Sequence, residues 1–182
     1  MPLLFLEMNT AFDNIKPPIS IKTARLTITD ITPDDKQTYF RLYTEEALNE
    51  WWGYDYRKDL GENAPTPEYF YSFMQELKAK KEEYSFAVRL DDKMIGELVL
   101  YNFTPDYSAE IGFRLFKDYH GKGYAYESAN ALKKYAMNSL GVKCLKSRCF
   151  KVNAPSKRLI EKLGLIKVDQ NQTHYFFELQ DK

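Results

Sequence analysis

A glycine-rich turn between two different hydrophobic periodicities constrains this chain most. Residues 112–130 read Gly-Phe-Arg-Leu-Phe-Lys-Asp-Tyr-His-Gly-Lys-Gly-Tyr-Ala-Tyr-Glu-Ser-Ala-Asn, an apolar strand pattern that runs through the turn into a helical pattern. Gly121 and Gly123 allow positive φ and a close approach of the backbone, so successive N–H groups can converge at the positive end of the following helix. The turn therefore predicts a site for a phosphate group.

Two other phosphate-binding motifs are excluded by the residues around the turn. A Walker loop needs Ser or Thr after its Gly-Lys pair, whereas Lys122 is followed by Gly123. A dinucleotide fingerprint needs a third small residue at position 126, where Tyr126 would obstruct packing of the helix on the strand. A purely structural left-handed turn without a ligand remains the alternative at this point.

The size and composition of the chain are those of one globular domain. With 182 residues, 44% hydrophobic and 29% charged, the chain has room for a single core. We expect residues 1–18 to form an extension and residues 19–182 to form the domain. No stretch approaches the ~18 apolar residues of a membrane span, and the first residues lack the pattern of a signal peptide. The sequence thus predicts a cytoplasmic protein that does not bind membranes.

Cysteine and histidine are too few and too scattered for several kinds of site. Cys144 and Cys149 lie on one expected strand at an odd separation, so their side chains should point to opposite faces without forming a disulfide. His120 and His174 are far apart, and neither lies beside a pair of cysteines. We therefore expect no metal site and no Ser-His-Asp triad.

The net charge of zero conceals two regions of opposite charge. Residues 114–162 contain twelve Lys and Arg against three Asp and Glu, a surplus of nine, and the rest of the chain carries the balancing negative charge. The neutral total gives no reason to expect a nucleic acid. The basic half, which contains the glycine turn, suits an anionic ligand, and the acidic remainder suits a cationic substrate. Ordinary solvated charges would give the same count.

Taken in order, the hydrophobic periods predict alternating strands and helices. We expect a first strand over 19–30. A helix should run from Thr32-Pro33 to about residue 49, with Tyr39, Leu42 and Tyr43 buried. A second helix should run from Thr66-Pro67 to about Glu83, and its apolar stripe should consist of Phe70, Phe73 or Met74, and Leu77. Strands should follow over 84–90, 93–103 and 108–116, then a helix over 122–139, a strand over 142–150, a helix from Asn153 to Gly164 and two last strands.

Three stretches together resemble one enzyme family. His120-Gly121-Lys122-Gly123-Tyr124-Ala125 resembles the acetyl-CoA pyrophosphate loop of the GNAT N-acetyltransferase superfamily, with His120 departing from the usual Gln or Arg. Residues 153–165, from Asn153 to Glu161-Lys162-Leu163-Gly164-Leu165, resemble its second signature, with Leu165 in place of Phe. The Thr-x-Arg-Leu strand at Arg25 and the residues around the turn resemble the RimJ/RimL-like branch. The resemblance spans about residues 20–180.

The resemblance implies a fold and a cofactor. The fold would be α+β, with a mostly antiparallel twisted sheet of about seven strands and about four helices splayed around acetyl-CoA. Backbone N–H groups of the turn, at His120, Gly121, Lys122, Gly123, Tyr124 and Ala125, would hold the pyrophosphate. The strand before it, at Phe113, Arg114 and Leu115, would meet the thioester and pantetheine. Asn153 and Ser156 would reach the pantetheine arm and sulfur, although both also fit plain helix capping.

The implied reaction is direct transfer of the acetyl group to an amine. Glu110, a carboxylate in an otherwise apolar strand, is the predicted base, and Glu97 on the preceding strand is the second choice; each could instead simply face outward. Many members of the family carry a Tyr acid seven residues after the motif Asn, but Ile160 occupies that position here. Ser156 therefore becomes the predicted hydrogen-bond donor.

Aromatic and acidic residues between 45 and 62 form the predicted acceptor site. Trp52, Tyr54 and Tyr56 are the substrate-binding candidates, since rings mixed with carboxylates suit an ammonium group; tryptophans that only cover the core are the alternative. The branch implies a protein N-terminal α-amine as acceptor. A polyamine, an amino acid or an aminoglycoside is the alternative, as is a non-catalytic acyl-CoA-binding module. The protein could be a monomer or a homodimer.

Overall fold

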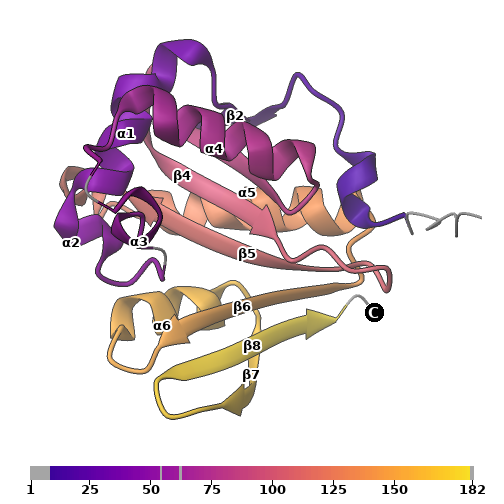
Figure 1. Cartoon of the computed structure of the whole chain (residues 1–182). Coiled ribbons are helices and arrows are strands. Elements are labelled where there is room, and N and C mark those ends of the chain that lie inside the picture. Colours follow the sequence, from indigo (N-terminus) through magenta and orange to yellow (C-terminus); the bar gives the residue numbers. More distant parts are fainter. Residues whose placement is uncertain (1–8, 54, 62, 181–182) are drawn as a thin grey trace, which may run out of the picture.

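One twisted sheet of eight strands runs through the computed structural model, which describes residues 9–53, 55–61 and 63–180 (Figure 1). Its strand order is β1-β2-β3-β4-β5-β6-β8-β7, and every neighbouring pair is antiparallel except β5 and β6. The strands are β1 (Ser20–Lys22), β2 (Leu26–Asp30), β3 (Glu83–Leu90), β4 (Lys93–Tyr101), β5 (Ser108–Leu115), β6 (Cys144–Phe150), β7 (Ile166–Gln170) and β8 (His174–Gln180).

Helices cover both faces of this sheet. The described residues contain six α-helices, namely α1 (Lys36–Thr44), α2 (Glu46–Asn49), α3 (Arg57–Leu60), α4 (Pro67–Ala79), α5 (Tyr124–Asn138) and α6 (Ala154–Lys162). Helices α1 and α4 pack on one face around Tyr39, Leu42, Tyr43, Phe70 and Met74. Helices α5 and α6 lie on the other face, where the larger core contains Leu132 and Ile160 (Figure 1). The predicted α+β class with a mostly antiparallel sheet is confirmed.

The parallel pairing of β5 with β6 is short. Only Ser108, Ala109 and Glu110 pair with Cys144, Leu145 and Lys146. Beyond them β5 continues along β4 as far as Leu115, while β6 continues along β8 as far as Phe150. The two strands therefore separate in the middle of the sheet, and one backbone edge of each is left unpaired there.

The first predicted strand, over 19–30, is wrong, because the chain turns back inside it to form the β1–β2 hairpin. The Thr23 N–H donates to the Leu26 carbonyl at 2.9 Å, and the Leu26 N–H donates to the Thr23 hydroxyl at 2.9 Å. The Thr23 hydroxyl in turn donates to Glu127 on α5 at 2.6 Å. Because α5 holds the turn from outside, the local alternation of residues contained no sign of it.

The first predicted helix is also interrupted, at Glu45, whose backbone is extended. In a continuous helix the Leu42 carbonyl would accept from the Glu46 N–H. Here it accepts instead from the side chains of Asn49 and Arg114, both at 3.0 Å. A contact made by β5 therefore divides the predicted helix into α1 and α2. The predicted burial of Tyr39, Leu42 and Tyr43 is confirmed.

The second predicted helix ends earlier than expected. Helix α4 stops at Ala79, and Lys81 adopts the left-handed conformation, with φ 59°. The Glu82 N–H then closes the helix end on the Leu77 carbonyl at 3.0 Å, the pattern of a Schellman cap. Because lysine takes the place where glycine is usual, the stop was not visible in the sequence. Glu83, placed at the end of the helix by the sequence, is the first residue of β3.

The segment before β1 packs on the domain where the structure describes it. Ala11 is fully buried, and the Phe12 ring contacts Phe103 edge to face at 5.2 Å between centroids. The Asn14 amide donates to the Leu140 carbonyl at 2.9 Å. On β6, Cys144 and Cys149 are both free and buried, and they lie on opposite faces of the strand as predicted.

A buried ion pair ties α1 and α2 to the sheet. The Arg114 guanidinium donates twice to Glu97 Oε2, at 2.9 and 2.7 Å, and the two side chains are 4% and 0% exposed. Arg114 also donates to Asn49, and its guanidinium lies 4.2 Å from the ring centroids of Tyr43 and Trp52. Glu97 Oε1 is buried without a hydrogen-bond partner among the described residues. One arginine thus joins β4, β5, α1 and the segment after α2.

We expect Glu97→Gln to lower the free energy of unfolding by about 3–5 kcal/mol, because it leaves the buried Arg114 charge without its partner. Urea unfolding at pH 7, followed by circular dichroism, measures the change. Replacing both partners, Glu97→Met with Arg114→Met, should recover a large part of the loss, since no isolated charge is then buried. A loss below about 1 kcal/mol for the single variant would contradict this account.

Candidate functional site

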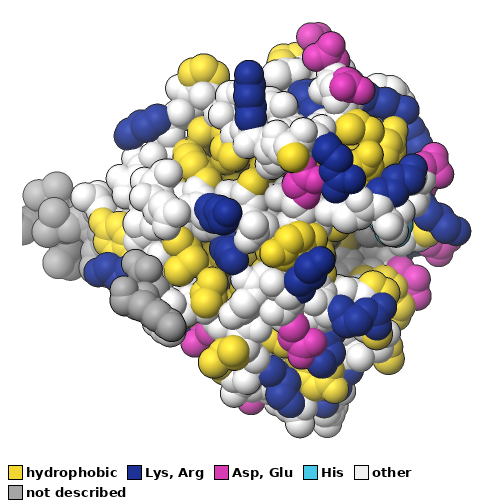
Figure 2. Space-filling model, turned by 180° about the vertical axis from the view of Figure 1, so that it is seen from behind, with side chains coloured by type: hydrophobic (Ala, Val, Ile, Leu, Met, Phe, Trp, Pro, Cys, Tyr) yellow, Lys and Arg dark blue, Asp and Glu magenta, His cyan; other side chains and the backbone are white. Residues whose placement is uncertain are grey.

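The separation of β5 and β6 opens into a cleft with a volume of about 1130 Å³. Its lining comes from both sides of the sheet: the turn before α5, the ends of β5 and β6, the start of α6 and the segment after α2. In Figure 2 the molecule is notched where the body carrying α5 meets the part built from α6, β7 and β8. Lys and Arg side chains lie on both sides of this notch.

The glycine turn forms one end of the cleft. Gly121 and Gly123 have φ of 73° and 81°, so the predicted positive φ is confirmed at both. Gly123 is the N-cap of α5 and makes no side-chain cap, so the first N–H groups of the helix, from Tyr124 on, have no intrahelical acceptor. Their partial positive charge adds to that of the helix dipole. This end of the cleft can therefore bind an anion.

Arg25 holds the turn from outside. Its Nε donates to Glu127 at 2.7 Å, and its Nη1 donates to the Lys122 carbonyl at 3.0 Å. The guanidinium also lies 4.5 Å from the centroid of the Tyr124 ring. Glu127, one turn into α5, binds both Thr23 and Arg25 of the β1–β2 turn, which fixes the start of the helix against the sheet. The sequence marked Arg25 as part of a motif but did not predict this contact.

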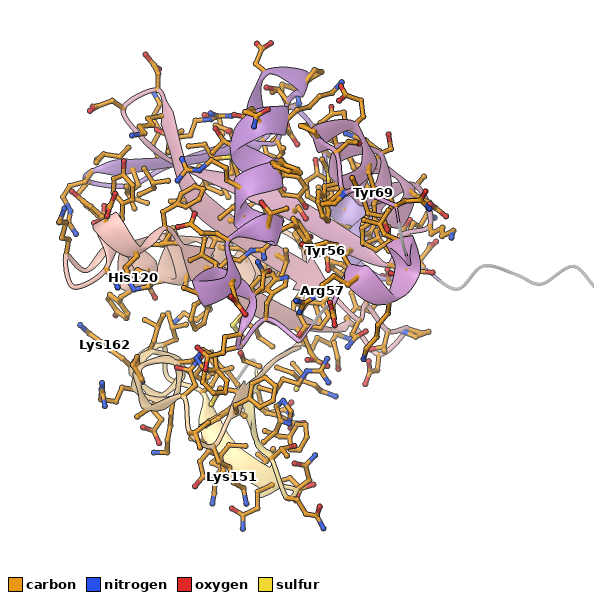
Figure 3. The ribbon with its side chains drawn as sticks, turned by 60° about the vertical axis from the view of Figure 1, so that its left-hand side comes forward. Tyr56, Arg57, Tyr69, His120, Lys151 and Lys162 are labelled. Atoms are coloured by element: carbon orange, nitrogen blue, oxygen red, sulfur yellow. The ribbon has the colours of Figure 1, made fainter. Side chains whose placement is uncertain are left out.

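Basic side chains surround the glycine turn. His120 hydrogen-bonds through Nε2 to the Leu115 carbonyl at 2.8 Å, which ties the turn to the end of β5. Because a carbonyl can only accept, His120 carries its proton on Nε2 in this contact. Lys162 of α6 lies 4.3 Å from the Tyr126 ring centroid, and Figure 3 shows it near His120 with the gap of the notch between them. Lys117 and Arg158 also line the cleft.

Unpaired backbone of β5 forms one wall of the cleft. The Ser147 hydroxyl donates to the Ile111 carbonyl at 3.0 Å, which shows that this carbonyl faces β6. Backbone groups two residues further on face the same way, so the N–H and C=O of Phe113 point into the opening. Arg114 pairs with Glu97 on the β4 side, and the Leu115 carbonyl binds His120. Of the three predicted strand residues, Phe113 thus offers its backbone to the cleft.

Helix α6 supplies the opposite wall. The Asn153 side chain caps it by accepting from the Ser156 N–H at 3.1 Å, so the capping predicted for Asn153 is confirmed. Asn153 and Ser156 both line the cleft. Ile160 is fully buried in the core, and its position therefore could not present a side chain to a ligand. Cys149 lines the cleft from β6, and burial raises the pKa of its thiol.

Aromatic rings form the end of the cleft away from the glycine turn. Trp52 covers Gly112, where an added Cβ would lie 2.8 Å from Val99 and 3.5 Å from the Trp52 ring. Trp51, 41% exposed, contacts Phe150 of β6 at 5.5 Å between centroids. The Phe150 ring lies 4.0 Å from that of His174. These contacts connect the segment after α2 with the β6–β8 part across the cleft.

The three predicted substrate residues are distributed differently from the prediction. Trp52 lines the cleft, whereas Tyr54 lies outside the described residues. Tyr56 packs edge to face on Phe70 of α4, at 5.2 Å, and borders a second hollow of about 590 Å³. Figure 3 shows Tyr56 beside Arg57, away from His120 and Lys162. Of the two candidates within the described residues, Trp52 lies in the same cleft as the glycine turn and Tyr56 does not.

Glu110 and Glu97, the two predicted bases, are already bound to other side chains. Glu110 accepts from the Asn102 amide at 2.8 Å and lies 3.7 Å from Arg148 Nε. Glu110 lies where β5 and β6 begin to separate. Among the described residues, it is not part of the lining of the cleft. Glu97 is completely buried against Arg114. Neither carboxylate reaches the cleft surface.

A third carboxylate, Glu83, does line the cleft, together with Tyr101 and Arg148. Sequence reasoning missed all three. Glu83 was assigned to the end of a helix, and Tyr101 was one aromatic among many on an apolar strand. Glu83 is paired with Tyr101 on the neighbouring strand. The sequence would have indicated this pairing only if β3 had been predicted to begin at Glu83.

The described residues contain no group of three or more His, Cys, Asp or Glu side chains placed to hold a metal ion. Within the same part of the chain, no helix has both the length and the apolar surface that crossing a membrane requires.

Comparisons with known proteins agree on one family. The model described as "Acetyltransferase (GNAT) domain" matches residues 25–166. The chain is 28% identical over 146 residues to a Bacillus subtilis (strain 168) protein named as the uncharacterized N-acetyltransferase YnaD, which covers 80% of this chain and 81% of the relative. A second relative from the same strain, named as the uncharacterized N-acetyltransferase YoaA, is 22% identical over 81% of this chain and 82% of its own.

Solved structures share the fold at low sequence identity. RimJ of Mycobacterium smegmatis in complex with CoA-disulfide superposes with a TM-score of 0.78 at 15% identity, over 95% of this chain and 90% of that one. The spermidine N-acetyltransferase of Vibrio cholerae, in complex with CoA and spermine, superposes with a TM-score of 0.74 at 16% identity, over 87% and 96%.

We expect Arg25→Met to loosen the glycine turn, because it removes the contacts to Glu127, Lys122 and the Tyr124 ring. Amide hydrogen exchange of residues 121–125 should become up to about tenfold faster, a modest effect because Arg25 is 46% exposed. As a control, Lys80→Met removes an equally simple ion pair, with Glu76, far from the turn. Unchanged exchange in Arg25→Met would show that the turn is rigid without this arginine.

Proposed function

The chain belongs to the GNAT family of acetyltransferases, and from this premise we propose that it transfers the acetyl group of acetyl-CoA directly to a protein N-terminal α-amine. The observation that supports this most is the cleft itself. One end has free helix N–H groups and basic side chains, and the rest of the lining includes aromatic rings and the carboxylates of Glu45 and Glu83. An anionic donor and an amine acceptor can therefore enter from opposite ends and meet between β5 and β6.

The residues of the cleft fit the parts of acetyl-CoA. N–H groups from Gly121 to Ala125 would hold the pyrophosphate. A side chain at Gly123 would oppose the positive φ that aims these groups and would press on Arg25, since an added Cβ lies 3.3 Å from its guanidinium. The free backbone of Phe113 would pair with the amide groups of the pantetheine arm, as a strand would. Asn153 and Ser156 would face that arm from α6. Bound here, the donor supplies an activated acetyl group.

Proton transfer needs a base for the amine and a hydrogen-bond donor for the departing sulfur. The base predicted from the sequence, Glu110, stands beside the point where the strands separate, but its carboxylate does not reach the cleft surface. The Ser156 hydroxyl would donate a hydrogen bond to the departing sulfur, because Ile160 is buried where other members carry tyrosine. A thiol with a pKa near ~8.5 is a good leaving group, so a neutral hydroxyl donor suffices.

The pKa of the amine favours an α-amine as the acceptor. An α-amine, with a pKa near ~7.8, is neutral to the extent of roughly a tenth at pH 7, whereas deprotonating a lysine side chain near ~10.4 costs about 3.5 kcal/mol more. An α-amine therefore needs only a weak base. A polyamine is the second candidate acceptor, supported by the rings and carboxylate at the far end of the cleft, which suit a small cation as well.

We expect purified protein to acetylate peptides with free N-termini. The screen uses acetyl-CoA with a panel of peptides that differ in the first residue, an N-acetylated lysine peptide, spermidine, spermine and kanamycin, read by mass spectrometry. Without an amine the mass of the protein should stay unchanged, because direct transfer forms no acetyl-enzyme. Faster acetylation of spermidine than of any peptide would replace the proposed acceptor. CoA binding without transfer to any amine would identify a binding module.

We expect Gly123→Val to weaken CoA binding by about a hundredfold or more in calorimetry, because the new side chain meets Arg25 and opposes the positive φ that aims the N–H groups. Gly141→Val is the matched control, since Gly141 has a similar φ of 75° in open space after α5. It should cost similar backbone strain and leave CoA affinity unchanged. Normal affinity in Gly123→Val would refute the assignment of the turn.

A further inference from the structure

Glu83 stands in a row of polar side chains that crosses the face of the sheet under Trp52. Glu83 on β3 is opposite Tyr101 on β4, and Tyr101 is opposite Glu110 on β5. Directly opposed residues point to the same face, and neighbouring strands lie about 5 Å apart. Glu83 and Tyr101 line the cleft together with Trp52. The carboxylate therefore belongs to the end of the cleft where the amine enters.

The surroundings of Glu83 keep it partly protonated near neutral pH. Burial, and then the negative charge of Glu97, raise its pKa to about 7, while the Ser85 hydroxyl and the Arg114 charge oppose the change. Ser85 donates to Glu83 Oε1 at 3.2 Å. From α1, Tyr43 also faces this charge. Arg114 offsets the raised pKa of Glu83 only in part, and its hydrogen bonds to side chains and backbone go to Glu97, Leu42 and Asn49.

The two other acidic candidates are less suited to take a proton from an amine in the cleft. Glu110 already accepts from Asn102, lies near Arg148 and stands outside the lining of the cleft. Glu97 forms an ion pair inside the core. Glu83 combines access to the cleft with a hydrogen bond from the neutral Ser85 hydroxyl. A general base works best when its pKa lies near the working pH.

We propose that Glu83 is a catalytic residue of this acetyltransferase, the carboxylate that takes the proton from the acceptor amine beneath Trp52. This assignment rests on the proposed function, because it requires an amine to react in this cleft. The ammonium first gives one proton to the Glu83 carboxylate. The neutral nitrogen then forms a bond to the acetyl carbonyl carbon while the bond from that carbon to sulfur breaks. The second nitrogen proton goes to the departing thiolate, and Glu83 returns its proton to water.

The first test needs no acceptor and follows the carboxyl group itself. In protein labelled with ¹³Cδ-glutamate, NMR titration should show one carboxyl signal with its midpoint near pH 7. Glu83→Gln should abolish this signal, whereas Glu110→Gln and Glu82→Gln should keep it. Loss of the signal in Glu110→Gln, with retention in Glu83→Gln, would give the base role to Glu110 and overturn the proposal.

The second test measures transfer to whichever peptide or polyamine of the panel above reacts fastest. Glu83→Gln should lower kcat about a hundredfold at pH 7 and remove the rise of kcat between pH 6 and 8, with the Kd for CoA within twofold of the wild type. Glu83→Asp, which keeps a carboxylate, should recover part of the rate. Glu82→Gln is the matched control: it removes the same charge at an exposed neighbouring residue and should leave all of these values unchanged.

The outcomes separate this assignment from the function on which it rests. An active wild-type protein whose Glu83→Gln variant keeps its rate and pH profile overturns the role of Glu83 alone. A folded Glu83→Gln protein with weaker CoA binding and an unchanged pH profile overturns it too, because the residue would then act on structure. A wild-type protein that acetylates no amine overturns the proposed function, and the role of Glu83 with it.

Discussion

The short pairing between β5 and β6 is the constraint on which the rest of the structure depends. A parallel pair that continued past Glu110 and Lys146 would close the sheet and bury the backbone edge at Phe113. The separation can persist because each strand keeps its other partner, β4 for β5 and β8 for β6. Backbone groups left unpaired inside a protein are costly unless a ligand or water satisfies them. The open edge is therefore a structural argument for an extended ligand with amide groups of its own.

The buried pair of Arg114 and Glu97 connects this opening to the acceptor side. Arg114 lies on the strand that forms one wall, and its guanidinium fixes both the end of α1 and the ring of Trp52. Burying two charges gains little net stability by itself, because desolvation offsets much of their attraction. What the pair does here is position elements, and its carboxylate makes ionisation of Glu83 harder. One interaction thus shapes the acceptor end and tunes a titratable group in it.

Local signals sufficed for most of the fold and failed where a distant residue, or a lysine in a conformation usual for glycine, decides the local conformation. The hairpin between β3 and β4, the helix α5 and the cap at Asn153 all follow from neighbouring residues, and each was predicted. The turn between β1 and β2 depends on Glu127, the break before α2 depends on Arg114, and the end of α4 depends on a left-handed lysine. None of these three positions has a Gly or Pro to mark it, so the hydrophobic periodicity predicted that the strand or helix continues through it.

The same division explains why the positive φ angles of the glycine turn could be predicted from the sequence, whereas the residues at the opposite end of the cleft could not. Binding a pyrophosphate relies on backbone N–H groups, and glycines in a turn before a helix record that requirement within six residues. The proposed amine site consists of side chains from β3, β4 and the segment after α2, which only the sheet register brings together. Glu83 is an example. The end of α4 was predicted four residues too late, so Glu83 was assigned to the helix although it is the first residue of β3. The proposed role of Glu83 therefore depends on the register of β3 against β4, because a shift of one residue would move Glu83 to the opposite face of the sheet.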